Sequence, residues 1–279
     1  MDLTNEKIIE LKNTANEIRK SIIEMIFKAN SGHTAGSLGM ADVFTLLYFH
    51  VLRHKPKEPL WADRDRLVLS NGHICPVLYA SMAHSGYFPI KELDTLRVFG
   101  SRLQGHPHRK FLPYLETSSG PLGSGLSQAI GMAKVMKMDK KTNEFVYCLM
   151  SDGELDEGQI WEAVMLASKE NLGNLIVIID RNNIQISGYT IDVMPLGNLK
   201  EKWESFNWEV YEVNGHNFQE INKAIKKAKM KEYKPTVIIA NTIPGKGVSF
   251  MENDFHWHGK APNKDERDKA LLELNKNHA

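Results

Sequence analysis

Short apolar runs alternate with amphipathic segments along most of the chain. Five runs rich in aliphatic and β-branched residues have the length of strands, at positions 66–69, 145–149, 175–179, 209–213 and 236–240. Segments with apolar residues at helical spacing lie between several of them, at 125–138, 159–169 and 218–229. Strands that alternate with helices in this way build βαβ units. The pattern therefore predicts an α/β fold with a largely parallel sheet and helices on both faces.

Further helical patterns stand at the two ends of the chain. The apolar residues of the first segment fall on one helical stripe, Ile8, Leu11, Ala15, Ile18, Ile22 and Ile26. They predict an N-terminal helix over 4–30 that stops at the following Ser-Gly pair. A second helical run is expected over 40–52 and a charged tail helix over 265–275. Because no repeat or linker interrupts the pattern, we expect one domain over 1–279.

Composition narrows the functional classes. The 279 residues include 35 Lys and Arg, 34 Asp and Glu, and 42% hydrophobic residues. This apolar content argues against intrinsic disorder, and a net charge of +1 argues against a dedicated nucleic-acid binder. The sequence shows neither a leader pattern nor an apolar run close to the ~20 residues of a membrane span. Cys75 and Cys148, without a CxxC motif, fit free thiols in a reducing cytoplasm.

Polar and glycine residues follow each predicted strand. The strand at 145–149 leads into Ser151, Asp152 and Gly153, and the strand at 175–179 leads into Asn182. In open α/β sheets, ligands bind beyond the carboxyl ends of the strands. The Asp152 carboxylate and the Asn182 amide oxygen would stand on neighbouring strands, and such hard oxygen donors suit Mg²⁺ together with phosphate oxygens. An Asp that merely caps a helix is the simpler alternative, but the long apolar crossover between the two residues favours a metal site.

These segments resemble a known family. The stretches SDGELDEG at 151–158 and IDRNN at 179–183 are similar to the thiamine-diphosphate fingerprint, a Gly-Asp-Gly that ends in Asn. Five other motifs resemble transketolase and occur in its order: SGH at 31–33, LSNGH at 69–73, GHP at 105–107, SGPLGSG at 119–125 and HGKAP at 258–262. The resemblance implies a thiamine-diphosphate-binding fold of transketolase type over the whole chain.

The resemblance also implies a cofactor site. Asp152 and Asn182 would coordinate Mg²⁺ through their side chains and Ile184 through its carbonyl oxygen, with Ca²⁺ or Mn²⁺ as substitutes. The other residues implied to contact thiamine diphosphate are His73, Gly120, Leu122, Gly153 and His258. Ser151 departs from the fingerprint, which has glycine there, and leaves the geometry of the loop open.

Four histidines stand at the family's catalytic positions: His33, His73, His106 and His258. By resemblance, His33 and His106 would face the sugar, and the other two would face the diphosphate. A ring with an ordinary pKa near ~6.5 can donate or accept protons at neutral pH. Zinc is disfavoured, because no cysteine or HExxH helix accompanies these histidines. Thr34 and Ala35, after His33, replace the commoner Pro-Gly of the family.

Acidic residues crowd the start of the crossover helix predicted over 157–171. The resemblance places Glu157 and Glu162 at a subunit interface. Glu154 and Asp156 are interpreted as partners of the helix dipole, worth ~0.3–1 kcal/mol each.

A full transketolase continues into two further domains, and the sequence shows no second βαβ series. We therefore expect the N-terminal subunit of a split transketolase, active only with a C-terminal partner that carries the pyrimidine-binding domain, in an α2β2 assembly. Together they would transfer a two-carbon ketol unit between sugar phosphates.

Four alternatives stay open from the sequence. The first is a transketolase-like subunit for a branched, deoxy or sulfo sugar. The second is a 2-oxo acid dehydrogenase or decarboxylase α subunit, which should lack the motifs at 31–33 and 69–73. The others are a nucleotide-binding module, although the glycines at 120–125 and 245–247 match no phosphate-loop motif, and a cofactor-free scaffold.

Overall fold

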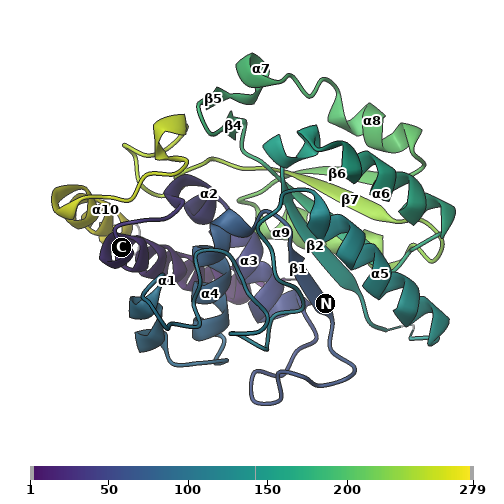
Figure 1. Cartoon of the computed structure of the whole chain (residues 1–279), viewed down its shortest axis with the longest axis horizontal. Helices are drawn as coiled ribbons and strands as arrows, with labels where there is room; N and C mark the ends of the chain where they lie inside the picture. The colour runs from purple at the N-terminus through teal and green to yellow at the C-terminus, as the bar shows by residue number, and fades with distance from the viewer. Residues whose placement is uncertain (1–2, 142, 277–279) are drawn as a thin grey trace.

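Five parallel strands form one sheet in the order β1-β2-β3-β7-β6 in the computed structural model, which describes residues 3–141 and 143–276 (Figure 1). The strands are β1 (Arg66–Leu69), β2 (Val146–Ser151), β3 (Leu175–Arg181), β6 (Glu209–Asn214) and β7 (Thr236–Asn241). All five predicted strands are therefore present. β2 begins one residue later than predicted and extends through Ser151. The predicted domain bounds of 1–279 include residues outside the described part of the chain.

Helices cover both faces of the sheet. One face packs against α1 (Asn5–Ala29), α2 (Thr34–Gly39), α3 (Ala41–Leu46), α4 (Cys75–His84) and α9 (Phe218–Lys229), and α10 (Lys264–Lys276) lies against α1. The other face packs against α5 (Ser124–Met138), α6 (Gly158–Lys169) and α8 (Leu199–Ser205). A small hairpin, β4 (Ile184–Gln185) and β5 (Gly188–Tyr189), precedes α7 (Thr190–Val193). The layering confirms the predicted α/β class with helices on both faces.

Strand residues supply two separate cores, because successive side chains of a strand point to opposite faces. In β3, Ile176 and Ile178 join the core beneath α1 to α4, whereas Val177 and Ile179 join the core beneath α5 and α6. All four side chains are fully buried. The continuous apolar character of this strand, which the sequence analysis used, follows from burial on both sides.

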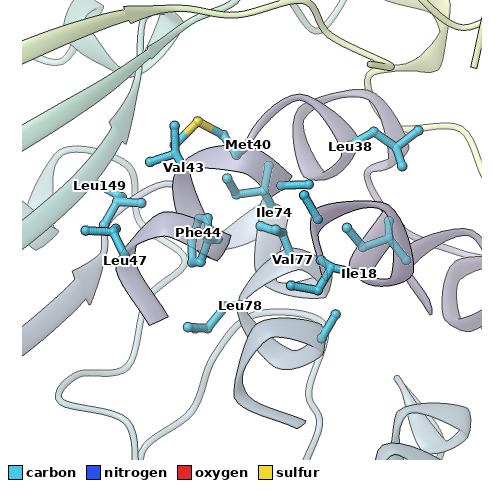
Figure 2. Close-up of a cluster of buried hydrophobic side chains, with 14 of the residues drawn as sticks. Ile18, Leu38, Met40, Val43, Phe44, Leu47, Ile74, Val77, Leu78 and Leu149 are labelled. Atoms are coloured by element: carbon cyan, nitrogen blue, oxygen red, sulfur yellow. The ribbon is translucent and has the colours of Figure 1, made fainter. Parts of the chain in front are cut away.

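Helices α1 to α4 contribute most of the first core. Figure 2 shows Ile18 of α1, Phe44 of α3 and Val77 of α4 gathered with Leu149 of β2 in one cluster. Each of these side chains is 0% exposed. Segments that are far apart in sequence therefore pack on the sheet as one layer. The motif at 31–33 lies between α1 and α2 of this layer, and the motif at 69–73 connects β1 to α4.

Helix boundaries follow the predictions at some ends and differ at others. The predicted helix over 4–30 is α1, with Thr4 as its N-cap and Asn30 in the left-handed conformation after its last residue. The predicted helix over 40–52 is divided into α3 and a π-helical segment, Leu47–Val51. The crossover helix predicted over 157–171 is α6, which begins one residue later and ends two residues earlier. A separate 3₁₀ helix, Gly153–Asp156, comes before it.

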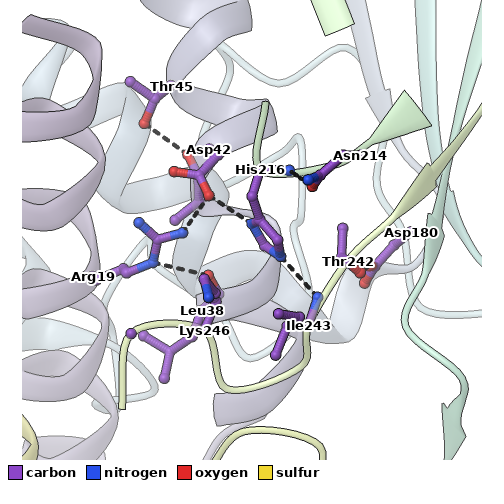
Figure 3. A network of polar contacts seen from close by, with 12 residues as sticks. Arg19, Leu38, Asp42, Thr45, Asp180, Asn214, His216, Thr242, Ile243 and Lys246 are labelled. Carbon is purple, nitrogen blue, oxygen red and sulfur yellow. Dashed lines mark hydrogen bonds and ion pairs between the residues drawn. The ribbon is translucent and has the colours of Figure 1, made fainter. Parts of the chain in front are cut away.

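A buried polar network ties the helical layer to the loops after β6 and β7 (Figure 3). Arg19 of α1 lies 2.6 Å from the Asp42 carboxylate of α3, and His216 Nδ1 lies 2.7 Å from the same oxygen. The backbone N–H of Ile243 donates to His216 Nε2 at 2.8 Å. Burial opposes ionisation of Asp42, but Arg19 and His216 hold its pKa below the ordinary value. His216 thus has a structural role.

Within the described ranges, we find no helix of the length and apolar character that a bilayer span requires.

Candidate active site

A cavity of about 410 Å³ opens at the carboxyl ends of the strands. Of the residues that the sequence assigned to the site, nine line its wall: His33, His73, His106, Gly120, Leu122, Gly153, Asn182, Ile184 and His258. They come from the ends of β2 and β3, from β4 (Ile184–Gln185), from the segments after α1 and β1, and from loops before α5 and α10. The parallel sheet brings these distant motifs to one edge, as the sequence analysis expected.

Three of the four histidines pack ring against ring. The centroids of His33 and His73 are 4.9 Å apart, and the His258 centroid lies 5.5 and 5.3 Å from them. Burial, followed by the neighbouring His258 and Arg97, lowers the pKa of His33 from 6.5 to about 4. Burial also lowers the pKa of His258. The pKa of His73 lies well below the ordinary value, chiefly because the ring is buried. These rings are therefore neutral at pH 7, and each offers one donor and one acceptor nitrogen.

His106 lines the same cavity, beside Gly120. A Cβ built on Gly120 would stand 3.8 Å from the His106 ring, and the glycine has φ 153°. Burial and the charge of Arg97 lower the pKa of His106. The Arg97 guanidinium is itself fixed by a bond of 2.7 Å to Ser31. The positive charge of Arg97 thus acts on both His33 and His106, the two histidines assigned to the sugar.

Asp152 is fully buried directly behind the wall, at the end of β2. One carboxylate oxygen accepts the N–H of Gly153 at 2.8 Å, and the other accepts the N–H of Asn183 at 2.7 Å and Arg181 Nη1 at 3.1 Å. Burial raises the pKa of Asp152, and the bond from Asn183 and the charge of Arg181 partly offset this. The Arg181 contact has no counterpart in the sequence interpretation.

The Asn182 side chain is held in one orientation. Its amide nitrogen donates to the Asp180 carboxylate at 2.8 Å, and its amide oxygen accepts the N–H of Ile184 at 3.0 Å. Asp180 also accepts a bond from the Thr242 hydroxyl of the loop after β7. Burial raises the pKa of Asp180 to about 7. Asp180 was not among the predicted residues, although it stands two positions before Asn182.

The donor set near the end of β2 and β3 fits a hard cation. Asp152, Asn182 and the backbone of Ile184 supply a carboxylate, an amide and a carbonyl oxygen, which are the ligand types that Mg²⁺ prefers. His33 Nδ1 and Gln185 Oε1 are buried polar atoms of cavity-lining residues with no hydrogen-bond partner in the described part of the chain. A polar ligand would satisfy such atoms. Across residues 3–141 and 143–276, no three His, Cys, Asp or Glu side chains form a metal cluster by themselves.

Ser151 keeps an ordinary backbone conformation. It is the last residue of β2 and is absent from the residues with positive φ. Its side chain lines the cavity beside Gly153. The serine at the first fingerprint position therefore does not disturb the strand end, which resolves the point that the sequence left open.

The interpretation of Glu154 as a partner of the crossover-helix dipole is wrong. The residue lies in the 3₁₀ helix Gly153–Asp156 and is 0% exposed. Its carboxylate accepts the N–H of Gly123 at 2.6 Å, the N–H of Ser151 at 3.2 Å and the Ser70 hydroxyl. Asp156 is exposed, but it also belongs to the 3₁₀ helix and not to α6.

Glu157 and Glu162 lie outside the cavity wall. Glu157 immediately precedes α6 and Glu162 is within it, and both are exposed. Both side chains are thus available at the surface of this chain, as an interface residue must be.

Comparison with known proteins identifies the family. Residues 10–277 match the family described as "Transketolase, thiamine diphosphate binding domain". The chain is 43% identical to the 6-deoxy-6-sulfo-D-fructose transketolase subunit of Clostridium sp. (strain MSTE9), over 98% of each chain. It is 40% identical to one subunit of the apulose-4-phosphate transketolase of Phocaeicola vulgatus, over 95% of this chain and 93% of that protein.

Solved structures agree with this match. Transketolase from Campylobacter jejuni superposes with a TM-score of 0.89 and 37% identity over 99% of this chain. This chain covers 43% of that transketolase, so it spans less than half of the protein's length. The fold and the cavity define a cofactor-binding α/β protein. The chain belongs to the transketolase family, as its thiamine diphosphate binding domain.

Proposed function

We propose that this chain is the N-terminal subunit of a two-chain transketolase. With its partner it would transfer a two-carbon ketol unit from a ketose phosphate to an aldose phosphate. The observation that carries the proposal is the convergence of four histidines, two glycine-containing loops and the Asn182 amide on one cavity, with the Asp152 carboxylate behind it.

We assign the metal and diphosphate to the ends of β2 and β3. Asp152, Asn182 and the carbonyl of Ile184 would hold Mg²⁺, and Gly153 leaves room for the diphosphate beside them. Gly120 and Leu122 would meet the pyrimidine half of the cofactor. Thiamine diphosphate, when bound, supplies the stabilisation of the carbanion that ketol transfer requires.

The histidines would handle protons and orient the sugar. Because His33, His73 and His258 are neutral at pH 7, each can accept a proton from a hydroxyl or donate a hydrogen bond to an oxygen. We assign His33 and His106 to the donor sugar's hydroxyl and carbonyl oxygens. His73 and His258 would lie toward the diphosphate, with His258 also near the reacting centre.

We propose that the remaining part of the active site belongs to a C-terminal transketolase subunit. Two relatives that this chain matches over almost their whole length are named as subunits. Helices α5 and α6 expose the apolar side chains of Val135, Met138 and Met165. These exposed side chains support a partner subunit that covers the two helices. Glu157 and Glu162 would lie in that interface, and we propose an α2β2 assembly.

A sulfo or branched sugar is a second candidate donor or acceptor. The relatives at 43% and 40% identity are named for 6-deoxy-6-sulfo-D-fructose and apulose 4-phosphate. These names favour a specialised transketolase over the ordinary pentose phosphate reaction. The buried thiols Cys75 and Cys148 support our assignment of the reducing cytoplasm as its compartment.

The test is a substrate panel with the reconstituted complex. This chain and its C-terminal partner are mixed with thiamine diphosphate and Mg²⁺ and offered xylulose 5-phosphate, 6-deoxy-6-sulfo-D-fructose or apulose 4-phosphate, each with aldose phosphate acceptors. Ketol transfer only in the mixture is the expected result. Transfer by this chain alone would disprove the two-chain proposal, and decarboxylation of 2-oxo acids without ketol transfer would disprove the reaction.

A further inference from the structure

Glu154 is a buried acid of the site that the proposed reaction does not use. It follows Asp152 and Gly153 in sequence and lines the cavity, and its side chain is 0% exposed. Its three hydrogen-bond donors belong to three different segments: Ser70 at the end of β1, Gly123 before α5, and Ser151 at the end of β2. One carboxylate thus joins two strand ends to the glycine loop.

The loop that Glu154 holds forms part of the cavity wall. Gly120 and Leu122 line the cavity, and Gly123, one residue further, donates its N–H to Glu154 at 2.6 Å. Gly123 has φ 82°, a left-handed conformation that favours glycine. The hydrogen bond from the Gly123 N–H to the Glu154 carboxylate therefore fixes the backbone between the cavity-lining residues 120–122 and the start of α5.

Ser70 extends the same connection to the first turn of α5. Its hydroxyl donates to Glu154 and accepts the N–H of Gly125 at 3.2 Å. The packing there is tight, since a Cβ on Gly125 would stand only 2.5 Å from the Ser70 side chain. The loop is consequently held at both Gly123 and Gly125.

Three hydrogen-bond donors face the carboxylate. An ionised carboxylate can accept all three bonds, whereas glutamine would turn its amide N–H₂ toward an N–H or a hydroxyl donor. Burial raises the pKa of Glu154, and the bonds from Ser70, Gly123 and Ser151 act in the opposite direction. Glutamine has nearly the same volume, so the Glu154→Gln substitution isolates the acceptor function from packing.

We propose that Glu154 is a positioning residue that fixes the loop 120–123 and so shapes the wall that receives the aminopyrimidine half of thiamine diphosphate. The inference rests on the proposed function for the identity of the ligand. The hydrogen-bond connection itself does not depend on any ligand, so it can be tested separately.

The first test measures hydrogen exchange of the ligand-free full chain. Glu154→Gln should speed amide exchange of the peptide that contains Gly123 and Gly125 by roughly tenfold or more. The substitution weakens the bond from the Gly123 N–H to the carboxylate and the bond from Ser70, whose hydroxyl holds the Gly125 N–H. Peptides of β7 should exchange as in the wild type. The control is Asp139→Asn, which removes an exposed carboxylate at the other end of α5 and should change neither region.

The second test compares two ligands in the two-chain complex, thiamine diphosphate and inorganic diphosphate, both with Mg²⁺. Glu154→Gln should weaken thiamine diphosphate binding roughly tenfold and change inorganic diphosphate binding less than about twofold. If Glu154→Gln does not fold, Ser70→Ala should show the same pattern with a smaller effect, because it removes one of the three donors to Glu154 and the acceptor of the Gly125 N–H.

Unchanged exchange of the loop, or an equal loss of affinity for both ligands, would overturn the inference. A wild-type complex that binds neither ligand would instead contradict the proposed function, and the exchange experiment would still decide the role of Glu154.

Discussion

Replacing His33 with asparagine should make the fold less sensitive to acid. The His33 ring packs against His73 and His258, and burial lowers its pKa from 6.5 to about 4. In the unfolded chain the ring is solvated and returns to its ordinary pKa. As the pH falls from 6.5 toward 4, the unfolded state takes up a proton that the folded state does not, so the free energy of unfolding decreases.

The two pKa values of His33 set the magnitude. With 6.5 in the unfolded chain and about 4 in the fold, linkage gives a loss of about 2 kcal/mol at pH 5, relative to pH 8. His73 and His258 also have lowered pKa values. Their titration adds to the loss, whereas Asp180, whose pKa burial raises to about 7, takes up a proton in the folded state and offsets part of it. The difference between the wild type and a His33 variant therefore isolates the part contributed by His33. Asparagine does not titrate in this range, so the variant should recover at least that part.

Urea titrations of the ligand-free chain at pH 8 and pH 5 measure the effect. The decrease in unfolding free energy between the two pH values should be about 2 kcal/mol smaller in His33→Asn than in the wild type. At pH 8, His33 is neutral in both the folded and the unfolded state, so a difference in unfolding free energy between the two proteins at that pH reports the packing change alone. Comparing the decreases from pH 8 to pH 5 removes it. Equal decreases in the two proteins would refute the reasoning, because His33 would then titrate alike in the folded and unfolded chains.

Three further substitutions test the packing that supports the site. Asp42→Ala leaves the guanidinium of Arg19 buried without its carboxylate, so urea titration should show a loss of about 3–5 kcal/mol; a loss under about 1 kcal/mol would contradict the network in Figure 3. Trp203→Ala removes a side chain that is 0% exposed and should cost about 3–5 kcal/mol in the same assay. Gly125→Ala, whose Cβ would stand 2.5 Å from Ser70, should destabilise by about 1–3 kcal/mol. Its control is Gly131→Ala in the same helix, which has no neighbour within 4 Å and should stabilise by about 0.5–1 kcal/mol.

The sequence predicted the strands and the residues at the ends of β2 and β3 for one physical reason, whereas the histidines and the loop 120–122 of the cavity wall came from the resemblance to transketolase. The apolar runs define where each strand ends, and parallel strands end at the same edge of the sheet. Residues that directly follow a run, such as Gly153 after β2 and Asn182 after β3, are therefore placed near one another by the fold.

Glu154 and Asp180 were missed because their surroundings come from distant segments. Glu154 bonds to Ser70 and Gly123, which are 84 and 31 positions away. Asp180 bonds to Thr242, which is 62 positions away. An acid near a helix start resembles an ordinary surface residue in a local pattern. One signal was present, since a glycine loop such as 119–125 contains backbone donors that need an acceptor when they are buried.

The active-site assignment depends most on Asp152, and calorimetric titration of thiamine diphosphate into the two-chain complex tests it directly. We expect binding that requires Mg²⁺, disappears with a chelator, and is weakened more than about tenfold by Asp152→Ala. Asp139→Asn should bind as the wild type does, and circular dichroism should show that both variants are folded. Undiminished affinity in Asp152→Ala, or wild-type binding that needs no divalent cation, would contradict the account.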